Sequence, residues 1–131
     1  MGKSLLSSCF PVGFISYSAR NVSLRLPSAA NVLSGTGGRG GIDFAGNFLV
    51  NLADVSYADP VIINPSGFLV TDVQKNAELA AYAINYVSGI SKNVNVSVIG
   101  WSQANTDVQW ALKYWPSTRS IVSDLIGISP L

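Results

Sequence analysis

The stretch VNVSVIGWSQANTDVQWALKYW, residues 94–115, decides the fold of this chain. It begins with valines at alternate positions and ends its first part in Val98 and Ile99, the β-branched pattern of a buried strand. A sharp turn at residues 100–103 follows. Beyond the turn, apolar side chains recur at i, i+3, i+4 and i+7 on one face of a helix: Val108, Ala111, Leu112 and Trp115. A serine on a tight turn between a strand and a helix is the context of a nucleophile elbow. The pattern therefore makes Ser102 a candidate nucleophile, and the alternative is an ordinary turn with a solvated serine.

The turn departs from the elbow motif G-x-S-x-G at one position. Gly100 and Ser102 match the motif, and Ala104 stands where the motif has its last glycine. That glycine lets the helix pack close to the strand, and alanine adds only one methyl group. The backbone N–H of Gln103, directly after the serine, can donate a hydrogen bond to an oxyanion.

Strand and helix patterns alternate on both sides of this stretch. The predicted strands cover residues 29–34, 58–64, 94–99 and 124–129. The order β-α-β-α-β-α-β predicts an α/β fold with a parallel sheet of about four strands and helices on both faces. Residues 1–32 are expected to form a poorly defined segment, and residues 33–131 a single partial domain.

Two helices are predicted before the organising stretch. The first follows the glycine-rich loop and has one apolar face, made of Phe44, Phe48, Leu49 and Leu52. The second covers about 72–88, and Thr71 with Gln74 three residues later predicts a capping box at its start. Asp107 and Lys113, on the helix after the turn, are expected on a solvated face.

A glycine-rich loop, Gly35–Gly41, follows the first predicted strand at the same end of the sheet as Ser102. Glycines let the backbone approach a substrate, so Thr36 in this loop can supply a second oxyanion donor. The loop also fits G-x-G-x-x-G, the fingerprint of a dinucleotide-binding module. Such a module needs an acidic residue near the end of the next strand, where Asn64 and Ser66 stand instead. The dinucleotide interpretation is therefore disfavoured, and no cofactor is expected.

The composition disfavours several functions. The net charge is +1 without a basic cluster, so nucleic acid is not an expected partner. No apolar run reaches the roughly 18 residues of a membrane span. The one cysteine, Cys9, has no companions for a metal site. The sequence contains no histidine, which is the usual base for a serine nucleophile. Its first 19 residues loosely resemble a signal peptide, which suggests secretion.

Three segments carry a resemblance: GTG at 35–37, VIINPSGFLVTDVQKNAELAAYAI at 61–84, and GWSQANTDVQWALKYWPSTRSIVSDLIGISP at 100–130. Together they resemble the fungal lipase B family, the Candida antarctica lipase B-like α/β-hydrolases, over about residues 33–130. The resemblance implies a truncated α/β-hydrolase fold and hydrolysis of triacylglycerols or other carboxylic esters. It implies Ser102 as nucleophile, Thr36 and Gln103 as oxyanion donors, a lipid or ester substrate, and secretion.

The chain departs from that family in ways that bear on activity. The family's catalytic acid and histidine lie downstream of the region that these residues cover. Leu131 stands where the family usually carries an aspartate, and the first 32 residues do not resemble the family. The expectation is an N-terminal part of a lipase that is inactive as this chain. The alternative is a non-catalytic remnant that binds acyl chains or a partner, and the sequence leaves the oligomeric state open.

Overall fold

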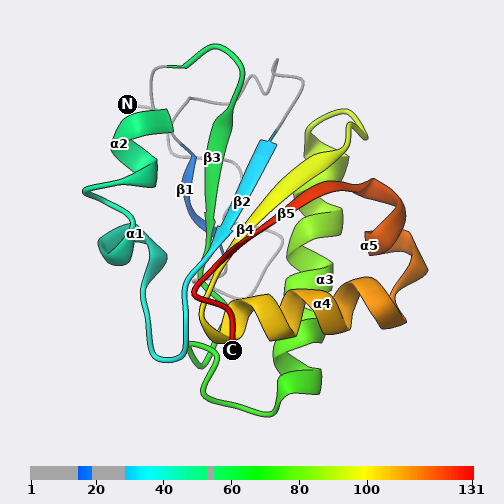
Figure 1. Cartoon of the computed structure of the whole chain (residues 1–131). Coiled ribbons are helices and arrows are strands. Elements are labelled where there is room, and N and C mark those ends of the chain that lie inside the picture. The colour runs from blue at the N-terminus through cyan, green and yellow to red at the C-terminus, as the bar shows by residue number, and fades with distance from the viewer. Residues whose placement is uncertain (1–14, 19–28, 53–54) are drawn as a thin grey trace.

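The alternating strand and helix patterns fold into one sheet with helices on each face (Figure 1). The computed structural model describes residues 15–18, 29–52 and 55–131. Within these residues the elements are, in chain order, β1 Ile15–Ser18, β2 Ala29–Leu33, α1 Gly40–Asp43, α2 Phe48–Leu52, β3 Asp59–Ile63, α3 Val73–Ile90, β4 Val96–Trp101, α4 Gln103–Tyr114, α5 Pro116–Ile121 and β5 Val122–Ile128. Of the first 19 residues, which resemble a signal peptide, 1–14 and 19 lie outside the described part.

The sheet has the strand order β1-β3-β2-β4-β5. The four strands β3, β2, β4 and β5 are parallel to one another, which confirms the predicted parallel sheet of four strands. The sequence did not predict β1, which pairs antiparallel with β3. Pro60 lies in β3 where the described part of β1 does not reach it, since Ser18 pairs with Val61. A proline there removes no hydrogen bond from that ladder.

The helices lie on opposite faces of the sheet, as predicted. In Figure 1, α1 and α2 lie to the left of the sheet and α3, α4 and α5 to the right. Successive strand residues point to opposite faces, so each face has its own core. On the α3–α4 face the core includes Leu33 and Val98, and on the α1–α2 face it includes Val32 and Ile99.

The sequence predicted one continuous helix after the glycine-rich loop, and this prediction is wrong. The chain forms two short helices, α1 and α2, instead of one. Gly46 lies between them, and the Asn47 side chain accepts a hydrogen bond from the backbone N–H of Phe48 at the start of α2. Glycine is a poor helix former and asparagine a good cap, which explains the break. The apolar residues still converge, because Phe48, Leu49 and Leu52 pack against the α1–α2 core.

The predicted cap of α3 is also wrong. Asp72, not Thr71, is the N-cap, and its carboxylate accepts a 2.8 Å hydrogen bond from the backbone N–H of Gln74. The Thr71 hydroxyl instead donates to Oδ1 of Asn76 at 2.6 Å. Aspartate caps a helix as well as threonine and adds a favourable charge at its positive end.

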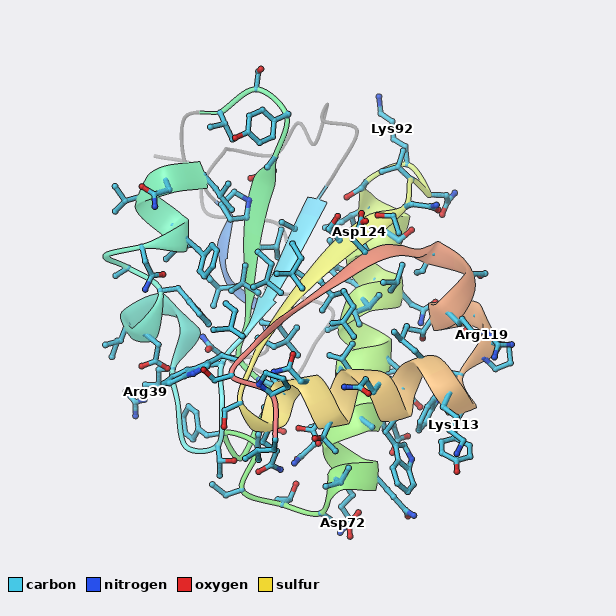
Figure 2. The ribbon with its side chains drawn as sticks, viewed as in Figure 1. Arg39, Asp72, Lys92, Lys113, Arg119 and Asp124 are labelled. Atoms are coloured by element: carbon cyan, nitrogen blue, oxygen red, sulfur yellow. The ribbon has the colours of Figure 1, made fainter. Side chains whose placement is uncertain are left out.

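Asp107 and Lys113 were both predicted on a solvated face of α4, and the prediction is wrong for Asp107. Lys113 is exposed, but Asp107 is completely buried. Figure 2 shows charged side chains in their usual place, at the outline of the molecule: Arg39, Asp72, Lys92 and Lys113. None of the helices among the described residues is both long enough and apolar enough to span a membrane.

Candidate active site

Ser102 occupies a strained turn between β4 and α4. Its φ of 55° and ψ of −126° lie outside the regions that residues with a side chain prefer. Two hydrogen bonds secure the turn: the Ser102 N–H donates to the Ile128 carbonyl at 3.0 Å, and the Asn105 amide donates to the Ser102 carbonyl at 2.9 Å. The turn places the serine at the N-terminus of α4, where the helix dipole favours negative charge.

Close packing around this turn requires glycines. A Cβ at Gly35 would lie 3.0 Å from the Ser102 Cβ, and one at Gly100 would lie 2.9 Å from Oδ1 of Asn105. Ala104, at the altered motif position, is fully buried in the α3–α4 core. The extra methyl group of alanine is therefore accommodated, and the departure from the motif leaves the turn intact.

The structure brings Thr36 and Gln103 together beside Ser102. The Thr36 hydroxyl donates a hydrogen bond to Oε1 of Gln103. Neighbouring parallel strands explain this meeting, because Leu33 at the end of β2 pairs with Gly100 near the end of β4. The loops that follow the two strands therefore leave the sheet at the same level.

A third loop, residues 64–72, supports the other two. Its Phe68 carbonyl accepts a 2.7 Å hydrogen bond from the Gly37 N–H. Its Leu69 carbonyl accepts from the side-chain amides of Gln103 at 3.2 Å and Asn76 at 3.3 Å. Phe68 and Leu69 both have positive φ, at 50° and 57°, so this loop is strained where it carries these contacts.

Two residues of this arrangement, Asn76 and Asn105, were not predicted from the sequence. Both are buried, and both tie a loop of the site to a helix. Asn105 also donates to the Ile128 carbonyl at 3.2 Å and so joins the turn to β5. The sequence offered one indication of their role. Each asparagine lies in a predicted helix beside apolar residues expected to be buried, and a buried side-chain amide needs hydrogen-bond partners.

The glycine-rich loop is used for packing in a way that does not suit a dinucleotide. The Gly40 N–H donates to Oδ1 of Asn64 at 3.0 Å. Asn64 stands where a dinucleotide-binding module would have its ribose-binding acidic residue, and here its side chain bonds to the glycine-rich loop instead. The helix that follows the loop, α1, has only four residues. Among the described residues, no group of three or more histidine, cysteine, aspartate or glutamate side chains could hold a metal ion.

Comparisons with known proteins agree with this geometry. The chain is 33% identical over 99 residues to lipase B of Pseudozyma antarctica, covering 76% of this chain and 29% of that protein. The crystal structure of Aspergillus fumigatus lipase B superimposes with a TM-score of 0.72 at 47% identity, covering 79% of this chain and 24% of that one. The mature form of Bacillus licheniformis lipase BlEst2 gives a TM-score of 0.69 at 18% identity, over 87% of this chain and 46% of that one. No family model matches.

The parallel sheet, the strained serine turn and these neighbours define an α/β-hydrolase-type chain. Within that class the chain is lipase B-like, and it spans about a quarter to a third of the length of the two lipase B proteins. The roles of Ser102, Thr36 and Gln103 and the boundary at residue 33 remain predictions.

Proposed function

We propose that this chain carries the nucleophile and the oxyanion-binding half of a site that hydrolyses carboxylic esters. Ser102 Oγ attacks the ester carbonyl carbon, and the backbone N–H groups of Thr36 and Gln103 donate to the oxyanion that forms. The observation that supports this most is the strained Ser102 at the start of α4, beside the loop that carries Thr36.

Thr36 acts through its backbone in this proposal. Its hydroxyl hydrogen is already donated to Oε1 of Gln103, so the side chain holds the two loops together. The backbone N–H groups at Thr36 and Gln103 are then the donors for the substrate. The proposed substrate is a lipid or another carboxylic ester, because the similar proteins named above are lipases. Secretion stays a prediction, and no cofactor enters the proposal.

Proton transfer is the part that these residues do not supply. A serine needs a base to take its proton, and the 131 residues contain no histidine. These residues alone therefore bind an ester or a tetrahedral analogue without efficient turnover. The same observation favours the second candidate, a non-catalytic module that binds acyl chains.

An alkyl boronic acid separates the two candidates, because boron becomes tetrahedral and anionic when it bonds to the serine oxygen, and at pH 8.5 the serine proton can be released to water or buffer in place of a histidine. We expect ¹¹B NMR of butylboronic acid with the 131-residue chain near pH 8.5 to show a bound tetrahedral boron signal. Ser102→Ala should abolish the signal. Ser120→Ala, an exposed serine on α5, should leave it unchanged.

Either of two results would overturn the proposal: no tetrahedral signal from the wild-type chain, or the same signal from Ser102→Ala. Binding of the boronic acid with boron still trigonal would favour the acyl-binding candidate, since the alkyl chain would then be held without help from the serine.

A further inference from the structure

A buried carboxyl group lies beside the supports of the site, and the proposed reaction does not use it. Asp107 on α4 is 0% exposed, and neither of its oxygens has a hydrogen-bond partner of ordinary geometry. The side-chain amides of Gln103 and Asn76 lie close enough to lower its pKa. A carboxyl group buried without firm partners is costly, so its presence calls for an explanation.

Both of those amides already hold the loop at residues 64–72. Gln103 and Asn76 each donate to the Leu69 carbonyl, and Asn76 donates in addition to the Thr71 carbonyl at 3.1 Å. On their oxygen atoms, Gln103 accepts from Thr36 and Asn76 accepts from Thr71. Asp107 therefore lies beside a hydrogen-bond network that joins Thr36, Leu69 and α3 through Gln103 and Asn76.

The protonation state of Asp107 decides which side of each amide it can bind. A neutral carboxyl group can donate to an amide oxygen, and it leaves the amide N–H groups on Leu69. A carboxylate can only accept, so at Asn76 it competes with the Leu69 and Thr71 carbonyls for the same N–H groups, whereas Gln103 gives only one of its two N–H groups to Leu69. Asn76 has two N–H groups and both are in use, so any bond that it gives to a carboxylate is taken from the loop.

We propose that Asp107 is a positioning residue whose ionisation loosens the loop at residues 64–72 and, through Gln103, its contact with Thr36. In the neutral form the two amides hold Leu69 and the site is ordered. In the ionised form the Asn76 amide turns from the loop toward Asp107, the Gln103 amide is drawn toward the same carboxylate, and the strained Phe68–Leu69 backbone is released. This role does not depend on Ser102 being a nucleophile.

The surroundings of Asp107 suit such a switch near neutral pH. Burial is the main cause that raises the pKa of Asp107 from 3.8 to about 7, and the nearby side-chain amides of Gln103 and then Asn76 lower it, although neither makes a hydrogen bond of ordinary geometry to the carboxyl group. The other ionisable residues of α3 and α4 and their ends lie elsewhere: Asp72, Lys75, Glu78, Tyr82, Lys113 and Tyr114 are exposed, and Tyr86 is half-buried. The carboxyl group therefore faces neutral amides.

The sign of the stability change follows from the raised pKa. The folded chain holds this proton more tightly than the unfolded chain, so its contribution is complete below about pH 4. That contribution is lost as the pH rises toward 7 and stays lost above it.

Hydrogen exchange measured by mass spectrometry or NMR tests the proposal on the 131-residue chain at pH 5.5 and 8.5, after correction for intrinsic exchange. The reporters are the N–H groups of Gly37, Phe68 and Val70, all hydrogen-bonded in or to the loop. We expect their protection to fall at least about tenfold more than that of the Val98 and Ile99 N–H groups in the sheet. Asp107→Asn should remove this extra loss, and Glu78→Gln, an exposed carboxylate on α3, should retain it.

Two outcomes would overturn the proposal. One is an equal change in loop and sheet, which would mean that ionisation destabilises the whole fold without positioning the loop. The other is an extra loss that persists in Asp107→Asn. The comparison of loop with sheet in the wild-type chain needs no variant, so it decides the question even if Asp107→Asn does not fold.

Discussion

Ser102 lies between two sides of the molecule that are built differently. Toward β2 and β3, the neighbouring strands are buried, and the loops that follow them are joined by hydrogen bonds from Thr36 and Gln103. Toward β5, the neighbouring strand is the edge of the described sheet, and most of its residues are exposed or half-buried. Beyond the pairing of β4 with β5, the Ile128 carbonyl ties that strand to Ser102 and Asn105.

The proposed chemistry is divided in the same way as the structure. The β2–β3 side supplies the preorganised donors that stabilise charge, and such donors work only when a packed framework holds them. On the β5 side, none of the described residues is placed for proton transfer to Ser102 in this proposal: the one carboxylate of β5, Asp124, is exposed and accepts a hydrogen bond from the Ser97 hydroxyl at 3.2 Å.

The largest effect expected from this division concerns turnover. Loss of the base leaves only binding and oxyanion stabilisation, so hydrolysis should be about 10⁴ to 10⁶-fold slower than in a complete serine hydrolase, or roughly 5–8 kcal/mol in barrier. We expect the purified chain to release aryl alcohol from a short-chain aryl ester no faster than Ser102→Ala does. Turnover that Ser102→Ala abolishes would show that an unrecognised base serves the serine.

The second effect concerns stability, and two isoleucines provide a matched pair. Ile62 in β3 is 0% exposed, and Ile126 in β5 is 48% exposed. We expect Ile62→Ala to lower the free energy of unfolding by about 2–4 kcal/mol, because it leaves a cavity in a packed core. Ile126→Ala should cost less than about 1 kcal/mol. Urea unfolding of both variants measures the difference, and equal losses would mean that the two sides are equally well packed.

The sequence predicted the parallel strands and the helices on both faces because those elements have strong periodic patterns. It failed where a pattern competes with local chemistry. The apolar face at Phe44–Leu52 predicted one helix, but Gly46 interrupts it. The strand β1 has only four residues, and its pairing with β3 depends on contacts that are distant in sequence.

The site was predictable in part for the same reason. Ser102 and Thr36 follow strands with clear patterns, so their meeting could be inferred from a parallel sheet. Asp107 was wrongly expected on a solvated face, because charged residues are rarely buried without a partner. Only the packing of α3 against α4, a tertiary effect, shows that Asp107 and Asn76 lie inside.

The last prediction concerns the edge of the described sheet at β5. A substitution there should change the free energy of unfolding least, but it should measurably change the self-association of the chain. An unpaired edge strand offers N–H and C=O groups to another chain, and exposed apolar residues strengthen such pairing. Ile126 is exposed although its neighbour in register, Ile99, belongs to the α1–α2 core. Ile126→Lys places a charge on this edge, so it should reduce self-association while the free energy of unfolding changes by less than about 1 kcal/mol. Sedimentation velocity over a range of concentrations measures the association.

Ile42→Lys makes the same change at an exposed residue of α1, away from the edge, and should leave association as in the wild type. If both lysine variants reduce association equally, net charge is the cause and the edge of β5 is not the contact.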